Sequence, residues 1–188
     1  MTSMKDLLKF ADRITDKELK KKVVEVLEHP ALAHKGIKIK PVKFEDSPGS
    51  VNWHHVKTGG LIEHTYSVVK NCIDVAENLK KTYKHDIDMD VLIASALVHD
   101  VGKLWTFQRD AKGNWEPTEL MLDHTMLGTA ELYARGFPEP VLHCVAAHFG
   151  ENGPTPPRTI EAIILHMIDN MDATLGAISK ENLLGLMG

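Results

Sequence analysis

Hydrophobic residues recur along most of the chain at intervals of three and four, the spacing of helices that bury one face. This pattern predicts helices over residues 4–14, 16–28, 60–82, 89–101, 120–135, 138–149 and 158–176. Thr15 is the expected N-cap of the second helix, because Glu18 follows it in a capping-box pattern. The helix over 89–101 is apolar on nearly every side, so we expect it at the centre of a bundle.

Two segments depart from the helical spacing. Residues 37–50 alternate between apolar and polar and then meet Pro41, Pro48 and Gly49, which predicts an extended linker. Residues 104–118 carry two short apolar runs around a glycine turn at 110–113, which predicts a β-hairpin. The expected fold class is therefore all-α, an irregular helical bundle with a small β-hairpin near 104–118. We expect N-terminal helices and a linker over 1–50 to pack on a single body over 51–188.

Composition narrows the class of protein. The 188 residues are 43% hydrophobic, which suits one globular domain, and no apolar run approaches the roughly 20 residues that span a bilayer. We therefore expect a cytoplasmic protein with no membrane partner. Cys72 and Cys144 both lie in helical patterns and predict core packing rather than a disulfide. The net charge is −4. A cluster of lysines in the second predicted helix is interpreted as a solvent-exposed face rather than a nucleic-acid-binding surface.

The unusual count is histidine, with eleven. The pair His99-Asp100 ends the most apolar helix, and a buried carboxylate there needs a cation from His99, Lys103 or a metal. Six residues of metal-ligand type lie on inward stripes of five predicted helices: His64, His99, Asp100, His124, His148 and Asp169. Without a metal they would form a dense unsatisfied cluster, so we predict a shared metal centre. Nitrogen and carboxylate ligands favour one or two ions of Mn, Fe, Co, Ni or Zn.

The order of these residues resembles that of the HD superfamily of metal-dependent phosphohydrolases, which are helical bundles. Within it the chain is most similar to the catalytic domain of bacterial 3′-5′ exoribonucleases of the HD type, over about residues 50–175. The similarity is carried by His54-His55, Gly59-Gly-Leu-Ile-Glu-His-Thr65, Ala96-Leu-Val-His-Asp-Val-Gly-Lys103, and Arg158–Ala162 through Leu165–Ala173. It implies a first ion held by His64, His99, Asp100 and Asp169, with Asp100 bridging to a second ion held by His124 and His148.

Two features depart from that family pattern. Phe149 stands where relatives often place a second histidine after the one that matches His148, which leaves the number of bound ions open. Those exoribonucleases also carry an OB-fold domain ahead of the HD domain, whereas residues 1–50 here are predicted helical and too short for one. A processive ribonuclease is therefore not expected.

Further residues are candidates for catalysis and substrate binding. Asp100 and Lys103 are the candidate catalytic residues, Lys103 because an ammonium one turn beyond the ligands can contact a phosphate oxygen. His54 and His55 precede the first ligand helix and, with Lys103 and Arg158, are candidates for binding the substrate. His166 is expected to orient Asp169. The aromatic residues Trp53, Trp105, Trp115 and Phe107 are interpreted as packing anchors rather than a base-stacking platform.

These residues predict a phosphohydrolase in which metal-activated water cleaves a phosphomonoester or phosphodiester of a nucleotide or short oligonucleotide. Two alternatives remain at this stage. Some HD relatives are di-iron oxygenases, and the chain could also be a non-catalytic binding module. The physiological substrate, the native metal and the oligomeric state are left open, because specificity depends on pocket walls that sequence does not display.

Overall fold

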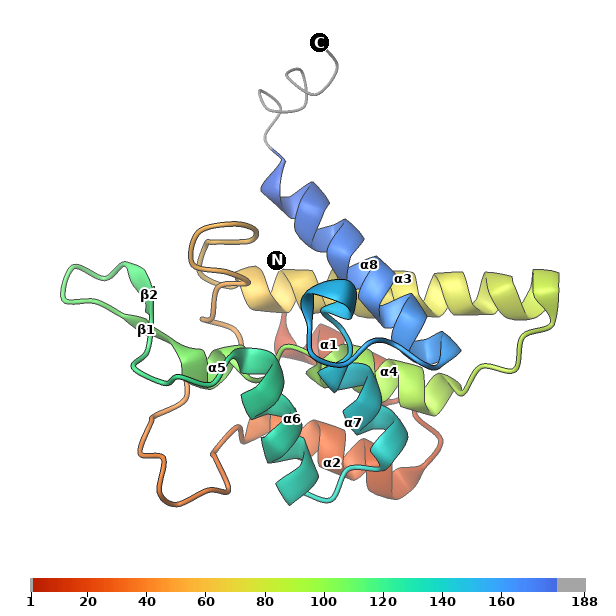
Figure 1. Ribbon diagram of the computed structural model, residues 1–188, viewed down its shortest axis with the longest axis horizontal. Coiled ribbons are helices and arrows are strands. Elements are labelled where there is room, and N and C mark those ends of the chain that lie inside the picture. Colours follow the sequence, from red (N-terminus) through yellow and green to blue (C-terminus); the bar gives the residue numbers. More distant parts are fainter. Residues whose placement is uncertain (1, 179–188) are drawn as a thin grey trace, which may run out of the picture.

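The computed structural model describes residues 2–178, which form a helical bundle with one small antiparallel sheet (Figure 1). The expected class, all-α with a small hairpin, is confirmed. Within the described residues, every helix is too short or too polar to cross a lipid bilayer. The elements in chain order are α1 (Met4–Ala11), α2 (Lys17–Glu28), α3 (Gly60–Tyr83), α4 (Met89–Val98), α5 (Lys103–Thr106), β1 (Phe107–Arg109), β2 (Trp115–Pro117), α6 (His124–Ala134), α7 (Glu139–Ala146), the 3-10 turn η1 (Gly150–Asn152) and α8 (Ile160–Ala177).

Helix α4 is the centre of the bundle, as its all-round apolar sequence predicts. Every residue from Val91 to Val98 is buried, and α4 packs against α1, α2, α3, α7 and α8. Helices α3 and α8 also pack against each other and cross in Figure 1. The N-terminal helices are part of this packing, since α1 contacts α3 and α4. The carboxyl end of α4 therefore opens into a region surrounded by other helices.

Helix ends differ from the sequence prediction where side chains compete for the backbone. The N-cap of α2 is Asp16, whose carboxylate accepts hydrogen bonds from the N–H groups of the first turn. Thr15 was expected in that role, but its hydroxyl donates to Asp90 of α4 at 2.7 Å instead. Helix α6 begins at His124 rather than near 120, because Asp123 caps it by accepting from the N–H of Met126. Residue spacing within one helix carries no information about a hydrogen-bond partner on another helix, so it could not predict this cap.

The hairpin is shorter than predicted. Its strands pair Phe107 with Pro117 and Arg109 with Trp115, but residues 103–106 form the helical turn α5. Trp105 in that turn is fully buried, and its indole N–H donates to the carbonyl of Pro30 at 2.7 Å. Packing of this aromatic side chain favours the helical turn over the strand that the local pattern predicted. The linker is tied to the same turn by a backbone hydrogen bond from Val42 to the carbonyl of Leu104.

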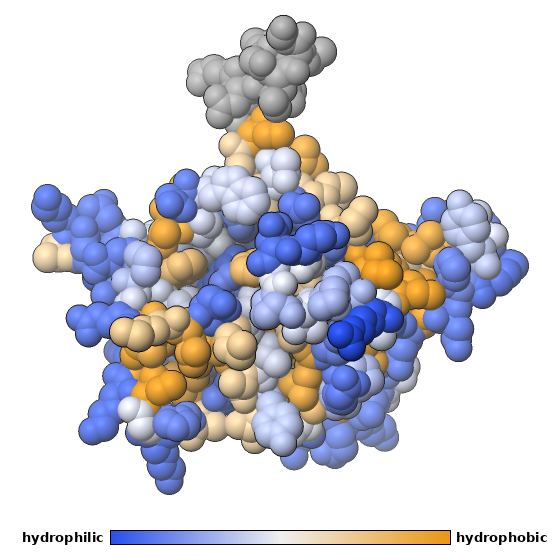
Figure 2. All heavy atoms as spheres, viewed as in Figure 1, coloured by the Kyte–Doolittle hydropathy of each residue, from blue (hydrophilic) through white to orange (hydrophobic). Residues whose placement is uncertain are grey.

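Helix α8 has two contrasting faces. One face leaves large hydrophobic side chains exposed at Ile163, Met167, Met171 and Leu175, and Figure 2 shows hydrophobic residues along this helix. The opposite face packs against α3 and α4 and carries Asp169 and Asp172 inward. The inward carboxylates are unusual for a helix in the packed part of the molecule, and they belong to the site described next.

Candidate metal centre

Asp100 lies at the centre of the candidate site. Helix α4 ends at Val98, so His99 and Asp100 fall in the turn before α5 rather than inside a helix that runs to 101. The Asp100 side chain is only 2% exposed. Its Oδ2 lies 3.4 Å from Nε2 of both His64 and His99, and its Oδ1 lies 3.2 Å from Nε2 of His124 and 3.8 Å from Nε2 of His148. Each carboxylate oxygen therefore faces a different pair of imidazoles.

Two clusters of possible ligands meet at this aspartate. The first contains His64 from α3, His99 and Asp169 from α8, and Oδ1 of Asp169 lies 3.0 Å from Nε2 of His64. The second contains Asp100, His124 from the start of α6, and His148 from the turn after α7. Within each cluster one ligand atom per residue lies within 4.8 Å of the others. The six residues predicted from the helical stripes thus converge on one point.

The hydrogen bonds of the imidazoles leave one nitrogen of each ring facing the centre. Nδ1 of His99 is bound to the carbonyl of Ala96 at 2.9 Å, and Nδ1 of His148 to the carbonyl of Val145 at 2.6 Å. With a proton on Nδ1, each ring donates to its carbonyl and presents the lone pair of Nε2. Among the described residues, Nε2 of His148 and Nε2 of His124 have no hydrogen-bond partner.

The electrostatics of the cluster also fit a divalent cation. Burial lowers the pKa of His64, but its hydrogen bonds to the aspartates raise it to about 10, and Asp100 likewise raises the pKa of buried His99 to about 9. The Nε2 atoms of these two rings are 3.3 Å apart, so two ring protons there would repel each other. Burial lowers the pKa of His148 to about 4, which keeps that ring neutral. A metal ion satisfies these nitrogens and carboxylates together.

Lys103 places an ammonium beside the same carboxylate. It begins α5, is 6% exposed, and its Nζ lies 2.6 Å from Oδ2 of Asp100. Burial raises the pKa of Asp100, but the charges of Lys103 and His99 hold it well below its ordinary value. The carboxylate is therefore ionised throughout the physiological pH range, as metal ligation requires.

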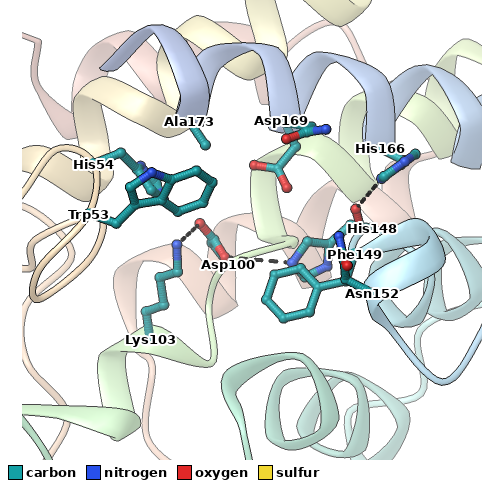
Figure 3. Close-up of a pocket in the computed structure, with 11 residues that line it drawn as sticks. Trp53, His54, Asp100, Lys103, His148, Phe149, Asn152, His166, Asp169 and Ala173 are labelled. Carbon is teal, nitrogen blue, oxygen red and sulfur yellow. Dashed lines mark hydrogen bonds and ion pairs between the residues drawn. The ribbon is translucent and has the colours of Figure 1, made fainter. Parts of the chain in front are cut away.

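A cavity of about 270 Å³ opens over Asp100 and Lys103. Figure 3 shows Trp53 and Phe149 on either side of Asp100. The side chains around it are Trp53, His54, Asp100, Lys103, His148, Phe149, Asn152, His166, Asp169, Asn170 and Ala173. Trp53 is 56% exposed, so its interpretation as a packing anchor is wrong, whereas Trp105 is such an anchor. Phe149 lies edge-on to the ring of His124, with ring centroids 4.9 Å apart.

Of the residues predicted to bind substrate, some line the cavity in the structure and others lie outside it. His54 is buried and lines the cavity, and burial with the nearby charge of Lys103 lowers its pKa to about 3, so the ring is neutral. His55 faces Asp172 rather than the cavity. Arg158 is exposed and does not line the cavity, while its backbone N–H donates to Nε2 of His143. Substrate binding by these residues stays a prediction.

Two details of the surrounding shell were not predicted. His166 does not orient Asp169, because its Nδ1 is bound to the carbonyl of His148 at 2.8 Å. Asp172 was missed, although its Oδ2 lies 2.7 Å from Nδ1 of His64. The sequence did contain a sign of this role: Asp172 follows Asp169 by three residues, which places both carboxylates on one side of α8.

A helical bundle that gathers imidazoles and carboxylates around one buried aspartate has the ligand set of a metal-dependent enzyme. The HD domain family model matches residues 61–174, and the chain belongs to this family of metal-dependent phosphohydrolases. This family and the curated phosphodiesterase reported next make the chain a hydrolase.

Several characterised proteins are similar to the chain. Dihydroneopterin 2′,3′-cyclic phosphate phosphodiesterase of Methanocaldococcus jannaschii is 41% identical over 177 residues, which cover 94% of this chain and 71% of that protein. The 3′-5′ exoribonuclease YhaM of Bacillus subtilis is 28% identical over 77% of this chain and 48% of its own length. YhaM of Geobacillus sp. (strain WCH70) is 30% identical over 73% of this chain and 44% of its own length. The chain thus spans less than half of either exoribonuclease, and no solved structure matches it.

Proposed function

We propose that the chain is a phosphodiesterase that opens the cyclic phosphodiester of a small nucleotide-like molecule, using one or two divalent transition metal ions. The proposed ligands are His64, His99, Asp100 and Asp169 for one ion, and Asp100, His124 and His148 for the other. The observation that carries the proposal is the position of Asp100, whose two oxygens face the two clusters at the floor of the cavity.

The substrate class is supported by the cavity and by the relatives. A space of about 270 Å³ suits a ligand the size of a mononucleotide better than a folded nucleic acid. Trp53 and Phe149 offer flat apolar surface to a heterocyclic ring beside the proposed metal ligands. The relative from M. jannaschii is named for a cyclic phosphate of a pterin, and its similarity covers almost the whole of this chain.

The residues of the cavity suggest how hydrolysis proceeds. Water attacks phosphorus, a new P–O bond forms as one ring ester bond breaks, and the proton that the water gives up ends on the departing hydroxyl oxygen. Metal ions bound at the two clusters would supply activated water and neutralise phosphate charge. Lys103, held beside Asp100, is placed to contact a phosphate oxygen and stabilise the charge that develops on it. Neutral His54 is placed to hydrogen-bond the substrate.

The proposal is tested with a substrate panel. Protein stripped of metal and reloaded separately with Mn²⁺, Fe²⁺, Co²⁺, Ni²⁺ or Zn²⁺ is assayed on dihydroneopterin 2′,3′-cyclic phosphate, nucleoside 2′,3′-cyclic phosphates, a phosphomonoester and a short oligoribonucleotide. We expect the highest kcat/KM on a cyclic phosphate. Preference for the oligoribonucleotide or the monoester, or no turnover with any ion, contradicts the proposal.

Trp53 is expected to bind the ring of the substrate. Replacing Trp53 with alanine should raise KM by about tenfold and leave kcat nearly unchanged, because stacking on an aromatic side chain is lost without change to the metal cluster. Trp53→Phe is the matched control and should retain most of the affinity. Steady-state kinetics on the best substrate of the panel give both constants. An unchanged KM in Trp53→Ala would exclude this contact.

Metal uptake is expected to release protons. Their aspartate neighbours raise the pKa values of His64 and His99 to about 10 and 9, so this pair holds a proton at pH 7. Because the two Nε2 atoms lie 3.3 Å apart, one proton between them must leave before both nitrogens bind a cation. Affinity for Zn²⁺ should therefore rise with pH from about 6 to 8, with about one proton released per protein at pH 7. Calorimetric titration in buffers of different ionisation enthalpy counts the protons. Zn²⁺ binding without proton release would show that these rings are already neutral.

A further inference from the structure

His55 adopts a backbone conformation that is uncommon for its residue type. Its φ is 47°, in the left-handed region that favours glycine. The carbonyl of His55 accepts a hydrogen bond of 2.9 Å from the N–H of Gly49, which holds the loop in this shape. Such conformations persist where surrounding contacts determine them, and they gather at functional sites.

Three glycines form a close-fitting seat around His55. A Cβ at Gly60 would lie 1.8 Å from the carbonyl oxygen of His55, and a Cβ at Gly49 would lie 2.8 Å from its Cβ. On α8, a Cβ at Gly176 would lie 2.3 Å from Cε1 of the His55 ring. The backbone and the ring of His55 are therefore confined by two separate parts of the fold.

The confined ring faces Asp172. Nε2 of His55 lies 3.7 Å from Oδ2 of Asp172, the same oxygen that lies 2.7 Å from Nδ1 of His64. The side chains of His55 and Asp172 are only 16% and 12% exposed, so the ring limits the access of water to this hydrogen bond. The other ring nitrogen, Nδ1 of His55, lies 3.1 Å from Nδ1 of His54 and is satisfied there. His54, His55 and His64 could form a third metal-ligand group by distance, but these hydrogen bonds already occupy Nδ1 of all three rings.

We propose that Asp172 and His55 are positioning residues for His64. Asp172 accepts the Nδ1 proton of His64 and so directs Nε2 toward Asp100 and Asp169, while His55, fixed in its glycine seat, keeps Asp172 in place. The inference rests on the metal site of the proposed function, because it concerns the orientation of one proposed ligand. It assigns to His55 a role in metal affinity rather than in contact with substrate.

The test measures Zn²⁺ affinity by competition with a chelator, so it needs no substrate. Asp172→Ala should weaken binding by about 10–100-fold, as loss of a partner behind a metal-bound histidine typically does. Asp172→Asn should retain most of the affinity, because its amide oxygen still accepts the proton. In the zinc-loaded protein, the Nδ1 proton of His64 should exchange slowly with water, and it should exchange faster in Asp172→Ala, as measured by NMR.

The role of His55 is tested through its seat rather than through the ring itself. Gly176→Ala places a methyl group where the ring lies, and should weaken Zn²⁺ binding by about tenfold. Alanine favours a helix more than glycine, so a loss of affinity would not come from a weaker α8. Thr174→Ala, at an exposed position on the same helix, is the matched control and should bind Zn²⁺ like wild type.

The outcomes separate this inference from the proposed function. Wild-type affinity in Asp172→Ala would overturn it, and wild-type affinity in Gly176→Ala would overturn the part assigned to His55. If Asp172→Ala fails to fold by circular dichroism, Asp172→Leu, whose side chain also cannot accept the proton, takes its place, and wild-type affinity there would overturn the inference. Wild-type protein that binds Zn²⁺ but cleaves no phosphodiester would refute the proposed function alone.

Discussion

Asp100→Asn is expected to lower kcat by about 10⁴-fold and to reduce the metal content of the protein. The substitution keeps the shape of the side chain but replaces one of the two oxygens that face the imidazole pairs with an amide nitrogen, which cannot bind a cation. It also removes the negative charge that faces Lys103 and four histidines. Loss of that charge weakens both clusters at once, which no other single residue of the site would do.

The measurement combines metal analysis with turnover on the best substrate. Asp74→Asn is the matched control, because Asp74 is an exposed carboxylate paired with Lys70 on the outside of α3. It should leave metal content and kcat unchanged. Circular dichroism confirms that Asp100→Asn remains folded. Full turnover in a folded Asp100→Asn protein would place the reaction elsewhere in the molecule.

Lys103→Met has the second largest expected effect, a loss of about 10²–10³-fold in kcat. Methionine keeps much of the length and the apolar stem of lysine but cannot donate to a phosphate oxygen. The proposed metal ligands are untouched, so metal content should stay at the wild-type level. The substitution should therefore remove an interaction that forms only in the transition state. In that case kcat and kcat/KM decrease by the same factor.

The alternative role of Lys103 is structural, as the buried partner of Asp100. A structural role alone would lower thermal stability or metal content, whereas the fully loaded protein would turn over normally. Lys57→Met is the control, because Lys57 is exposed and pairs with Glu63 near the same loop. Unchanged kcat in metal-loaded Lys103→Met would assign the lysine to structure only.

The helical periodicity was sufficient to direct the candidate metal ligands toward one region of the core. His64 shares a stripe with apolar residues of its helix, and so its inward direction follows from spacing alone. The same reasoning applied to His148 and Asp169, and the structure brings His148 to Asp100 and Asp169 to His64. The family resemblance added the division of these residues between two metal ions. The inward direction of the side chains does not by itself give that division.

The residues around the cluster were harder to predict. Trp53 was interpreted as an anchor because aromatic residues in loops usually pack, but the loop before α3 leaves it 56% exposed at the cavity. Asp172 was overlooked because a carboxylate near the end of a helix is ordinarily solvated. The crossing of α8 over α3 brings it to His64. His166 was assigned to Asp169, but it bonds the backbone after α7.

By itself the sequence determined the helical class of this protein, the buried position of α4, and the inward direction of His64, His148 and Asp169, because periodicity reports the direction of a side chain from its own helix. Only the tertiary structure decided which oxygen of Asp100 faces which imidazole, which partner holds Nδ1 of each histidine, and where the cavity opens. Those distances depend on how α3, α6, α7 and α8 pack around α4, and on where each helix ends. A local sequence pattern contains neither the packing of one helix on another nor the exact residue at which each helix ends.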